Sequence, residues 1–372
     1  MKFFISLFLL FILFISCNTE GIRIDLQNSC ENAILTAEDI FDTIEFIPLE
    51  TNKNCLLRNP SVFGLDGDSV LIWDGNNIFR FLINGKYLNR IGTFGNGHGE
   101  HGRINSANLD LNRKRVLLGS PEGIIYKYDY NGNYIGQICL TFKDELLQAV
   151  KWSSEMDCFV CEVRKYSETG LTIFLRTFSY EGKLITSYEV YKDNDSSVKL
   201  NMLKTGMLRN GNNGVYFKIP FDNKLYFLSQ SGLTTSLEFD LGKYSPTRRD
   251  IEDVDYFYKN GEKKKLIDNI VIGEKYIFLS CIMKNDYQEY VIDRKTNTIK
   301  HCSFFKGNNP IYLSVNRMEK YTFWPWVSLN ENFFDIVPIE QFTAKELQQI
   351  GIGEQTDSQI FGQNPVLVIA YH

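Results

Sequence analysis

The residues best suited to chemistry cluster between positions 92 and 102, which read Gly-Thr-Phe-Gly-Asn-Gly-His-Gly-Glu-His-Gly. Five of these eleven residues are glycine. Because glycines leave backbone N–H groups accessible, such a loop could bind an anion or a glycan hydroxyl. The alternative is structural, since glycines also let a chain turn sharply between two strands. The candidate binding residues in this loop are Gly95, Asn96, Gly97, His98, Glu100 and His101.

The two histidines of this loop are spaced His-x-x-His, with Glu100 between them. A protein metal site needs at least three converging ligands, and His98 and His101 supply two. The chain has no Gly-x-Ser-x-Gly motif and no phosphate-binding loop. We therefore predict no metal ligand, no cofactor and no catalytic residue from these motifs.

Two tryptophans near the end of the chain, Trp324 and Trp326, are the other candidate binding residues. With the nearby Tyr321 they form an aromatic group, and aromatic faces provide large contact areas for sugars and peptides. The alternative is that these rings pack in the core between sheets.

The cysteines do not indicate a dedicated site. Besides Cys17 the chain has seven, an odd number with irregular spacing, which is not the pattern of a disulfide scaffold. Cys158 and Cys161 form a lone Cys-x-x-Cys within a strand pattern. Because positions i and i+3 of a strand point to opposite faces, we expect two packed cysteines there rather than a zinc or redox site.

The elements that must position these residues repeat along the chain. Four segments each combine a strand, a turn with glycine and a second strand, and their turn glycines are Gly85, Gly132, Gly182 and Gly232. These glycines are 47, 50 and 50 residues apart. Asn-Gly, Glu-Gly and Ser-Gly supply the positive φ that a tight hairpin needs. A fifth copy spans 287–302.

A second strand pair precedes each hairpin, at 62–73, 107–118, 150–163, 203–218 and 267–282. Four strands in a period of about 50 residues is typical of a β-propeller. The high content of aromatic residues, 14%, also favours strands.

The end of the chain predicts a sixth blade. Strands are expected at 323–328, 332–338 and 366–371, and an insertion at 343–363 is expected to contain a short helix at 344–350. A propeller must close its ring, so we predict that the strand at 44–49 completes the last blade beside 366–371. The expected fold class is therefore all-β: a six-bladed β-propeller of four-stranded antiparallel blades, closed by the N-terminal strand.

The first residues predict export. Residues 3–15 are apolar except for Ser6, a run too short to cross a bilayer but suited to a signal peptide. The run ends at Ser16-Cys17, which resembles a bacterial lipobox and would make Cys17 the lipid-bearing first residue of the mature chain. An ordinary secretory signal is the alternative. We predict a signal peptide at 1–16, an anchor linker at 17–40 and the propeller at 41–372.

Several of these motifs together resemble a known family, the six-bladed propeller lipoproteins of Bacteroidetes, whose architecture is related to NHL-repeat propellers. The matching segments are 46–51, 84–92, 94–100 and 364–369. The resemblance implies a propeller fold and a location in the cell envelope, where we expect the outer membrane to hold the anchor. It implies no established reaction.

The formal net charge of −5 argues against a nucleic-acid partner, which would require a basic surface. We therefore expect an envelope-anchored binding or interaction module, held to the membrane by its N-terminal lipid, whose partner is a glycan, a peptide or another envelope protein. The first alternative is a propeller enzyme, such as a lyase or glycosidase with a site at the channel mouth. The second is a structural scaffold without a small-molecule site.

Overall fold

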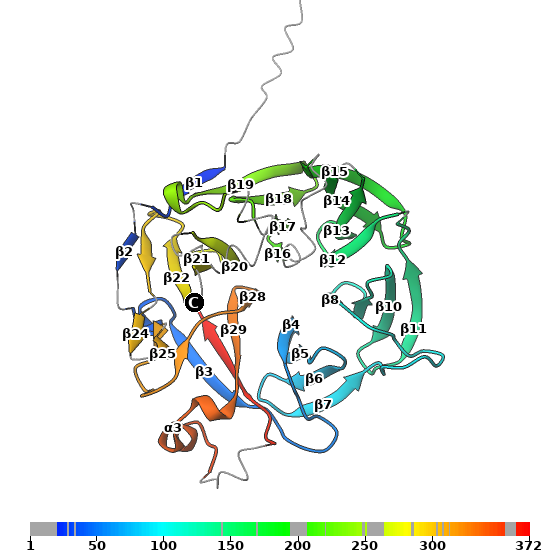
Figure 1. Cartoon of the computed structure of the whole chain (residues 1–372). Helices are drawn as coiled ribbons and strands as arrows, with labels where there is room; N and C mark the ends of the chain where they lie inside the picture. The colour runs from blue at the N-terminus through cyan, green and yellow to red at the C-terminus, as the bar shows by residue number, and fades with distance from the viewer. Residues whose placement is uncertain are drawn as a thin grey trace, which may run out of the picture.

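Six antiparallel β-sheets surround a central opening and form a closed ring, as Figure 1 shows. The structure, a computed structural model, describes residues 21–372 except 28–29, 33–34, 143, 169, 194–206, 220, 248–249, 251–263, 284–285, 303, 307–308, 312 and 354–361. The predicted six-bladed propeller is confirmed. We number the blades 1 to 6 in chain order, so that the blade beginning with β4 is blade 1.

In each of the first three blades, the first strand lies at the central opening and the fourth at the outer rim (Figure 1). Blade 1 contains β4 (Ser61–Asp66), β5 (Ser69–Trp73), β6 (Ile78–Leu82) and β7 (Tyr87–Ile91). Blade 2 contains β8 (Ser106–Asp110), β9 (Arg115–Gly119), β10 (Ile124–Asp129) and β11 (Tyr134–Cys139). Blade 3 contains β12 (Leu146–Ser153), β13 (Cys158–Ser167), β14 (Gly170–Ser179) and β15 (Leu184–Asp193).

Blades 4 and 5 follow the same order. Blade 4 contains β16 (Met207–Gly211), β17 (Gly214–Lys218), β18 (Lys224–Ser229) and β19 (Gly232–Asp240). Blade 5 contains β20 (Leu266–Ile272), β21 (Tyr276–Met283), β22 (Asp286–Asp293) and β23 (Ile299–His301). Residues 203–206 of the strand predicted at 203–208 lie outside the described residues, and β16 continues to Gly211.

Blade 6 joins the two ends of the chain. It contains β28 (Val327–Leu329), β29 (Asn332–Val337), β30 (Val366–Tyr371) and, at the rim, β3 (Thr43–Pro48). β3 pairs antiparallel with β30, from Thr43 opposite Tyr371 to Pro48 opposite Val366. The predicted closure of the ring by the N-terminal strand is therefore confirmed.

The first strand of blade 6 starts later than the predicted 323–328. β27 (Thr322–Phe323) pairs instead with β26 (Leu313–Ser314), and β28 begins only at Val327. The break coincides with Pro325, which has no N–H to donate to a ladder. A separate hairpin of β24 (Phe304–Lys306) and β25 (Asn309–Ile311) precedes this segment.

The N-terminal segment adds two strands to the rim. β1 (Ile22–Asp25) pairs parallel with β19 of blade 4, and β2 (Cys30–Asn32) pairs parallel with β23 of blade 5. Part of the range predicted as a linker, 17–40, therefore belongs to the sheets. The outer edges of these blades present unpaired backbone groups, and an added strand satisfies them.

The turn glycines explain why the hairpins repeat so clearly. Gly85 has φ +87° and Gly132 has φ +87°, a conformation that favours glycine. A Cβ on Gly85 would lie 2.2 Å from the carbonyl oxygen of Pro48, and one on Gly132 would lie 2.7 Å from that of Arg90. Each turn thus packs directly on the backbone of the preceding blade's rim strand, which leaves no room for a side chain.

Apolar side chains fill the spaces between neighbouring blades and form the core. Cys158 contributes to the cluster between blades 3 and 4, whereas Cys161 contributes to the cluster between blades 2 and 3. Both thiols are buried and free, as expected for positions on opposite faces of one strand.

The predicted short helix is α3 (Ala344–Gln349), and it ends before Gly351, whose φ is +84°. Glu346 forms a capping box with Thr343 and also accepts hydrogen bonds from the backbone N–H groups of Glu319, Lys320 and Tyr321. Burial opposes its ionisation, but these N–H groups keep the pKa of Glu346 below its usual value. The helix therefore holds the segment that precedes β28.

Three short 3-10 helices complete the described elements: η1 (Ala37–Asp39), η3 (Gly242–Tyr244) and η4 (Ile339–Gln341). Among the described residues, no helix is both long and apolar enough to cross a membrane.

Candidate ligand-binding channel

The first strands of the six blades, β4, β8, β12, β16, β20 and β28, enclose the central opening (Figure 1). Two cavities lie along it, of about 770 and 570 Å³. Phe63 on β4 and Lys151 on β12 line both cavities. The cavities therefore meet in the interior, and together they form a channel with an opening on each face of the propeller.

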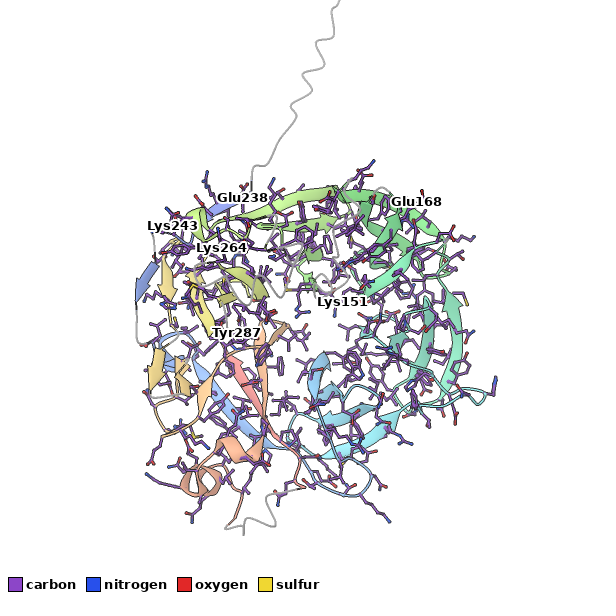
Figure 2. The ribbon with its side chains drawn as sticks, in the orientation of Figure 1. Lys151, Glu168, Glu238, Lys243, Lys264 and Tyr287 are labelled. Carbon is purple, nitrogen blue, oxygen red and sulfur yellow. The ribbon has the colours of Figure 1, made fainter. Side chains whose placement is uncertain are left out.

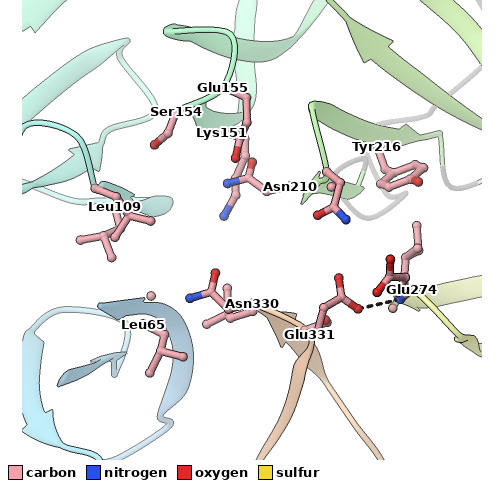
Figure 3. A pocket seen from close by; sticks show the side chains of 18 of the residues that line it. Leu65, Leu109, Lys151, Ser154, Glu155, Asn210, Tyr216, Glu274, Asn330 and Glu331 are labelled. Atoms are coloured by element: carbon pink, nitrogen blue, oxygen red, sulfur yellow. Dashed lines mark hydrogen bonds between the residues drawn. The ribbon is translucent and has the colours of Figure 1, made fainter. Parts of the chain in front are cut away.

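The larger cavity, which we call the hairpin-end cavity, lies where the first and second strands of the blades are joined by tight turns. Its lining includes Ser154, Asn210, Glu274 and Glu331, which Figure 3 shows around the cavity. Glu331 accepts a hydrogen bond of 2.7 Å from the backbone N–H of Glu274. This mouth is thus mainly polar and carries carboxylates, with Glu274 exposed to solvent.

The smaller cavity, which we call the loop-end cavity, lies where the chain enters the first strands. It combines two cations, Lys151 and Arg209, with two indole rings, Trp73 and Trp326. Trp326 is 53% exposed, so its ring is accessible to a ligand at this mouth. The polar lining also includes the side chains of Asn105 and Ser106 and one carboxyl group, that of Asp335.

Lys151 projects from β12 into the centre of the ring, whereas Glu238 and Lys243 lie at the outer rim (Figure 2). Apolar neighbours position it, since Val150 and Trp152 on either side are buried between blades and strand alternation turns Lys151 to the channel. Burial, and then the nearby guanidinium of Arg209, lower the pKa of Lys151 to about 8. At neutral pH it is therefore mostly charged, although its surroundings disfavour the charge.

Arg209 lies on β16, the first strand of the neighbouring blade. Its Nη1 donates to the carbonyl of Leu208 at 3.2 Å, and its Nη2 donates to Oδ1 of Asn269 at 3.4 Å. Its Nε is buried and has no hydrogen-bond partner among the residues that the structure describes. Burial lowers the pKa of Arg209, but an arginine stays charged at any physiological pH.

Asp335 lies on β29, on the opposite side of the channel from blade 3. Tyr321 donates a hydrogen bond of 3.1 Å to its Oδ2. Burial raises the pKa of Asp335 to about 7, although the bond from Tyr321 opposes this. At neutral pH about half of these carboxyl groups are neutral, so the cavity keeps a net positive charge.

The loop predicted to bind ligands, residues 92–102, is held by hydrogen bonds within itself, although Nε2 of the buried His101 has no hydrogen-bond partner among the described residues. The carboxylate of Glu100 accepts a hydrogen bond of 2.7 Å from the backbone N–H of Gly97 and lies against Gly95. Phe94 and His101 form a backbone bridge. The loop therefore has a clear structural role, which the sequence left open.

The histidines of this loop lie apart from the channel. His101 is fully buried, its Nδ1 lies 3.0 Å from the carbonyl oxygen of Gly102, and burial lowers its pKa. His98 is exposed and packs edge-on against Tyr134. Neither they nor Gly95, Asn96, Gly97 and Glu100 line the two channel cavities.

The two predicted tryptophans have different environments. Trp326 lines the loop-end cavity, as a binding residue should. Trp324 is 3% exposed, donates through Nε1 to Oγ of Ser280 at 3.0 Å and packs against Phe278. Its ring belongs to the core between blades 5 and 6, so we leave it out of the candidate site.

Sequence reasoning did not single out Lys151, Arg209 or Asp335. Each is a common residue type inside a strand, without a motif. The available signal was a charged residue beside apolar neighbours in the first or second strand of a blade. These strands lie next to the channel, so a charged side chain there can reach solvent through the channel.

The closed ring of six four-stranded blades around a channel makes this protein a six-bladed β-propeller. The chain belongs to the family described as "Domain of unknown function (DUF4934)", which matches residues 21–371. No curated protein matches the chain.

One solved structure supports the fold, and two others are similar at lower TM-scores. The supporting structure is that of a putative exported protein from Bacteroides fragilis. The match covers 94% of this chain and 98% of that protein, with a TM-score of 0.66 and 16% sequence identity. A structural genomics protein of unknown function from Bacteroides thetaiotaomicron covers 88% of this chain and 76% of its own, with a TM-score of 0.48 at 10% identity. A luciferin-regenerating enzyme covers 89% of this chain and 95% of its own, with a TM-score of 0.44 at 11% identity.

Proposed function

We propose that the protein is an exported, envelope-anchored binding module that takes its ligand into the central channel. The observation that carries this proposal is the loop-end cavity. There the half-exposed ring of Trp326 adjoins a volume of about 570 Å³, which is the size of a small-ligand pocket. An accessible aromatic ring beside polar groups favours a glycan or a peptide as the ligand. A partner envelope protein could present a sugar or a peptide segment to the same site.

Export and anchoring rest on the N-terminal sequence, with Cys17 as the lipid-bearing residue and the outer membrane as the expected location. The similar protein from Bacteroides fragilis is described as a putative exported protein, which supports export. The proposed kinship with NHL-like lipoproteins of Bacteroidetes also rests on sequence motifs. Labelling of cells with radioactive palmitate tests the anchor: the label should enter the wild-type protein and be lost from Cys17→Ala. Label that persists in this variant would exclude Cys17 as the lipid site.

Binding is tested with the soluble form, residues 18–372, on glycan and peptide arrays. We expect at least one ligand class to bind the wild type and to bind Trp326→Ala more weakly, because an accessible aromatic ring contributes contact area. Phe94→Ala is the matched control, since Phe94 is also 53% exposed but lines neither cavity. Equal losses in both variants, or no bound ligand, would contradict a channel site and favour a scaffold.

An enzyme remains the second candidate because of two observations. Asp335, with its pKa raised to about 7, could donate a proton at neutral pH, and the Glu331 carboxylate accepts from the backbone N–H of Glu274 at the hairpin end. A hydrolase or lyase should then turn over glycans found on the arrays, and Asp335→Asn or Glu331→Gln should abolish product formation while binding persists. An assay of new reducing ends measures hydrolysis, and the ultraviolet absorbance of the unsaturated product measures the lyase reaction.

A further inference from the structure

The loop-end cavity holds two positive charges close together. Lys151 and Arg209 lie on the first strands of adjacent blades and both line this cavity. Within the described part of the chain, Lys151 makes no hydrogen bond and neither residue forms an ion pair. Like charges that face each other without a counter-ion destabilise a folded protein, so a structure retains them where they serve a ligand.

The same cavity gathers polar atoms that lack partners. Four residues that line it, Trp73, Asn105, Ser106 and Arg209, each have one buried side-chain nitrogen or oxygen without a hydrogen-bond partner among the described residues. Buried polar groups are nearly always hydrogen-bonded in folded proteins, and exceptions in one place require an explanation. Other atoms of this kind, such as Nε1 of Trp152, lie elsewhere in the protein, but four of them gather around this one cavity.

We propose that the loop-end cavity binds an acidic ligand, whose oxyanion lies between the Lys151 ammonium and the Arg209 guanidinium while its ring contacts Trp326. This inference rests on the proposed binding function and specifies its ligand. An ammonium provides three donors and a guanidinium provides a planar fork that matches two oxygens of a carboxylate. The cavity volume of about 570 Å³ accommodates a sugar acid.

The charges around the rest of the channel support a site for an anion at this end. Asp335 is the carboxyl group of the loop-end lining, and its hydrogen bond from Tyr321 occupies one of its oxygens. The carboxylates of Glu155, Glu274 and Glu331 line the hairpin-end cavity, where the cations Lys151, Arg294 and Lys295 also lie. The loop-end lining has two cations and one carboxyl group, so it is the more positive end of the channel and the one that attracts an anion.

Isothermal titration calorimetry with the folded soluble chain, residues 18–372, tests the proposal. The probes are glucuronate and inorganic phosphate as two oxyanions, glucose as the neutral control and glucosamine as the cationic control. Glucuronate should bind at least tenfold more tightly than glucose, because charge-assisted bonds are lost with the carboxylate. Phosphate binding without glucuronate binding would assign the site to phosphate esters.

Two variants locate the site. Lys151→Met and Arg209→Gln should each weaken glucuronate binding by roughly tenfold to a hundredfold. Lys295→Met is the matched control, because Lys295 lines only the hairpin-end cavity, and it should bind as the wild type does. Circular dichroism and the thermal midpoint establish that each variant is folded.

The outcomes separate this inference from the proposed function. If an array ligand depends on Trp326 but binds Lys151→Met and Arg209→Gln as tightly as wild type, the binding function stands and the oxyanion site is wrong. If neither glucuronate nor phosphate binds better than glucose, the oxyanion site is also wrong. If the Trp326, Lys151 and Arg209 variants all leave every array ligand unaffected, the channel itself is not the binding site.

Discussion

The loop at 92–102 and the Lys151–Arg209 pair differ in how their charged groups are matched. In the loop, the carboxylate of Glu100 has the Gly97 N–H as its partner, and the ring of His101 is enclosed by Tyr126 and Tyr128. In the channel, the Lys151 ammonium has no partner among the residues that the structure describes. The loop is held mainly by its own contacts, whereas in the channel the Lys151 ammonium and Nε of Arg209 have no hydrogen-bond partner among the described residues.

A structural role and a binding role can therefore be told apart by the sign of the change in stability that a substitution causes. Residues whose polar groups are matched within the protein should stabilise the fold, and their loss should leave ligand binding unchanged. Residues whose charges are unmatched should weaken the fold and strengthen ligand binding. Substitutions in the two regions should therefore change stability in opposite directions.

The largest effect is expected at Gly92, the first residue of the loop. Its φ is +69°, and a Cβ there would lie 2.9 Å from Cζ of the buried Tyr128. Gly92→Ala should therefore lower the free energy of unfolding by about 2–4 kcal/mol. Urea denaturation measures the loss, and glucuronate affinity of the folded fraction should equal that of the wild type. Unchanged stability would show that the loop is not fixed by this turn.

Lys151→Met should change stability in the opposite direction. Its ammonium has a pKa of about 8 rather than 10.5 in the unfolded chain, so the folded state disfavours the charge at pH 7. Removing the charge should raise the free energy of unfolding by roughly 1–2 kcal/mol. This value is smaller than the pKa difference alone would give, because the ammonium contacts water in the channel. Urea denaturation at pH 7 measures the gain. A loss of stability would mean that the charge is already compensated in the free protein.

The pH dependence of binding comes next in size. Lys151 loses its proton as the pH rises through about 8, so glucuronate affinity should fall about tenfold between pH 7 and pH 9. Asp335 gains charge as the pH rises through about 7 and should weaken binding further between pH 6 and pH 8. Titration calorimetry of Lys151→Met should lack the step near pH 8 and retain the step near pH 7.

The same groups predict how stability varies with pH. Lys151 has a lower pKa in the folded chain than in the unfolded one, so its penalty disappears and stability rises between pH 8 and 10.5. Asp335 has a higher pKa in the folded chain, so stability falls as the pH rises from 3.8 to about 7. Denaturation of Asp335→Asn across this second range should lack that fall.

The smallest effect is expected at Glu100. Glu100→Gln keeps the size of the side chain but replaces a charge-assisted hydrogen bond to the Gly97 N–H with a neutral one. The free energy of unfolding should fall by about 0.5–1 kcal/mol, since a neutral bond is weaker. Ligand affinity should not change, and a tenfold loss of affinity would restore the loop as a binding site.

The fold was largely predictable because its signals are local. Gly85 and Gly132 mark hairpins that depend on a few neighbouring residues, and the pairing of 44–49 with 366–371 follows from closure of the ring. The rim strands β1 and β2 were not predicted, because strands of three or four residues depend on a neighbouring edge rather than on their own pattern.

The candidate site was less predictable because it is assembled from different blades. Trp326 was predicted as a candidate binding residue, with core packing as the alternative. Lys151 and Arg209 are 58 residues apart and become neighbours only when blades 3 and 4 pack together. The glycine-rich loop attracted the prediction because its composition is unusual. Its unusual residues are explained by a tight turn and by close packing against Tyr128.

The pairing of β1 with the rim of blade 4 fixes the point at which an N-terminal tether would leave the propeller. Three residues separate Cys17 from Gly21, so these two residues lie at most about 14 Å apart. With the proposed lipid on Cys17, the rim of blade 4 would therefore stay close to the bilayer. The two mouths of the channel lie on the faces of the ring rather than at this rim, so the anchor would be attached away from both of them.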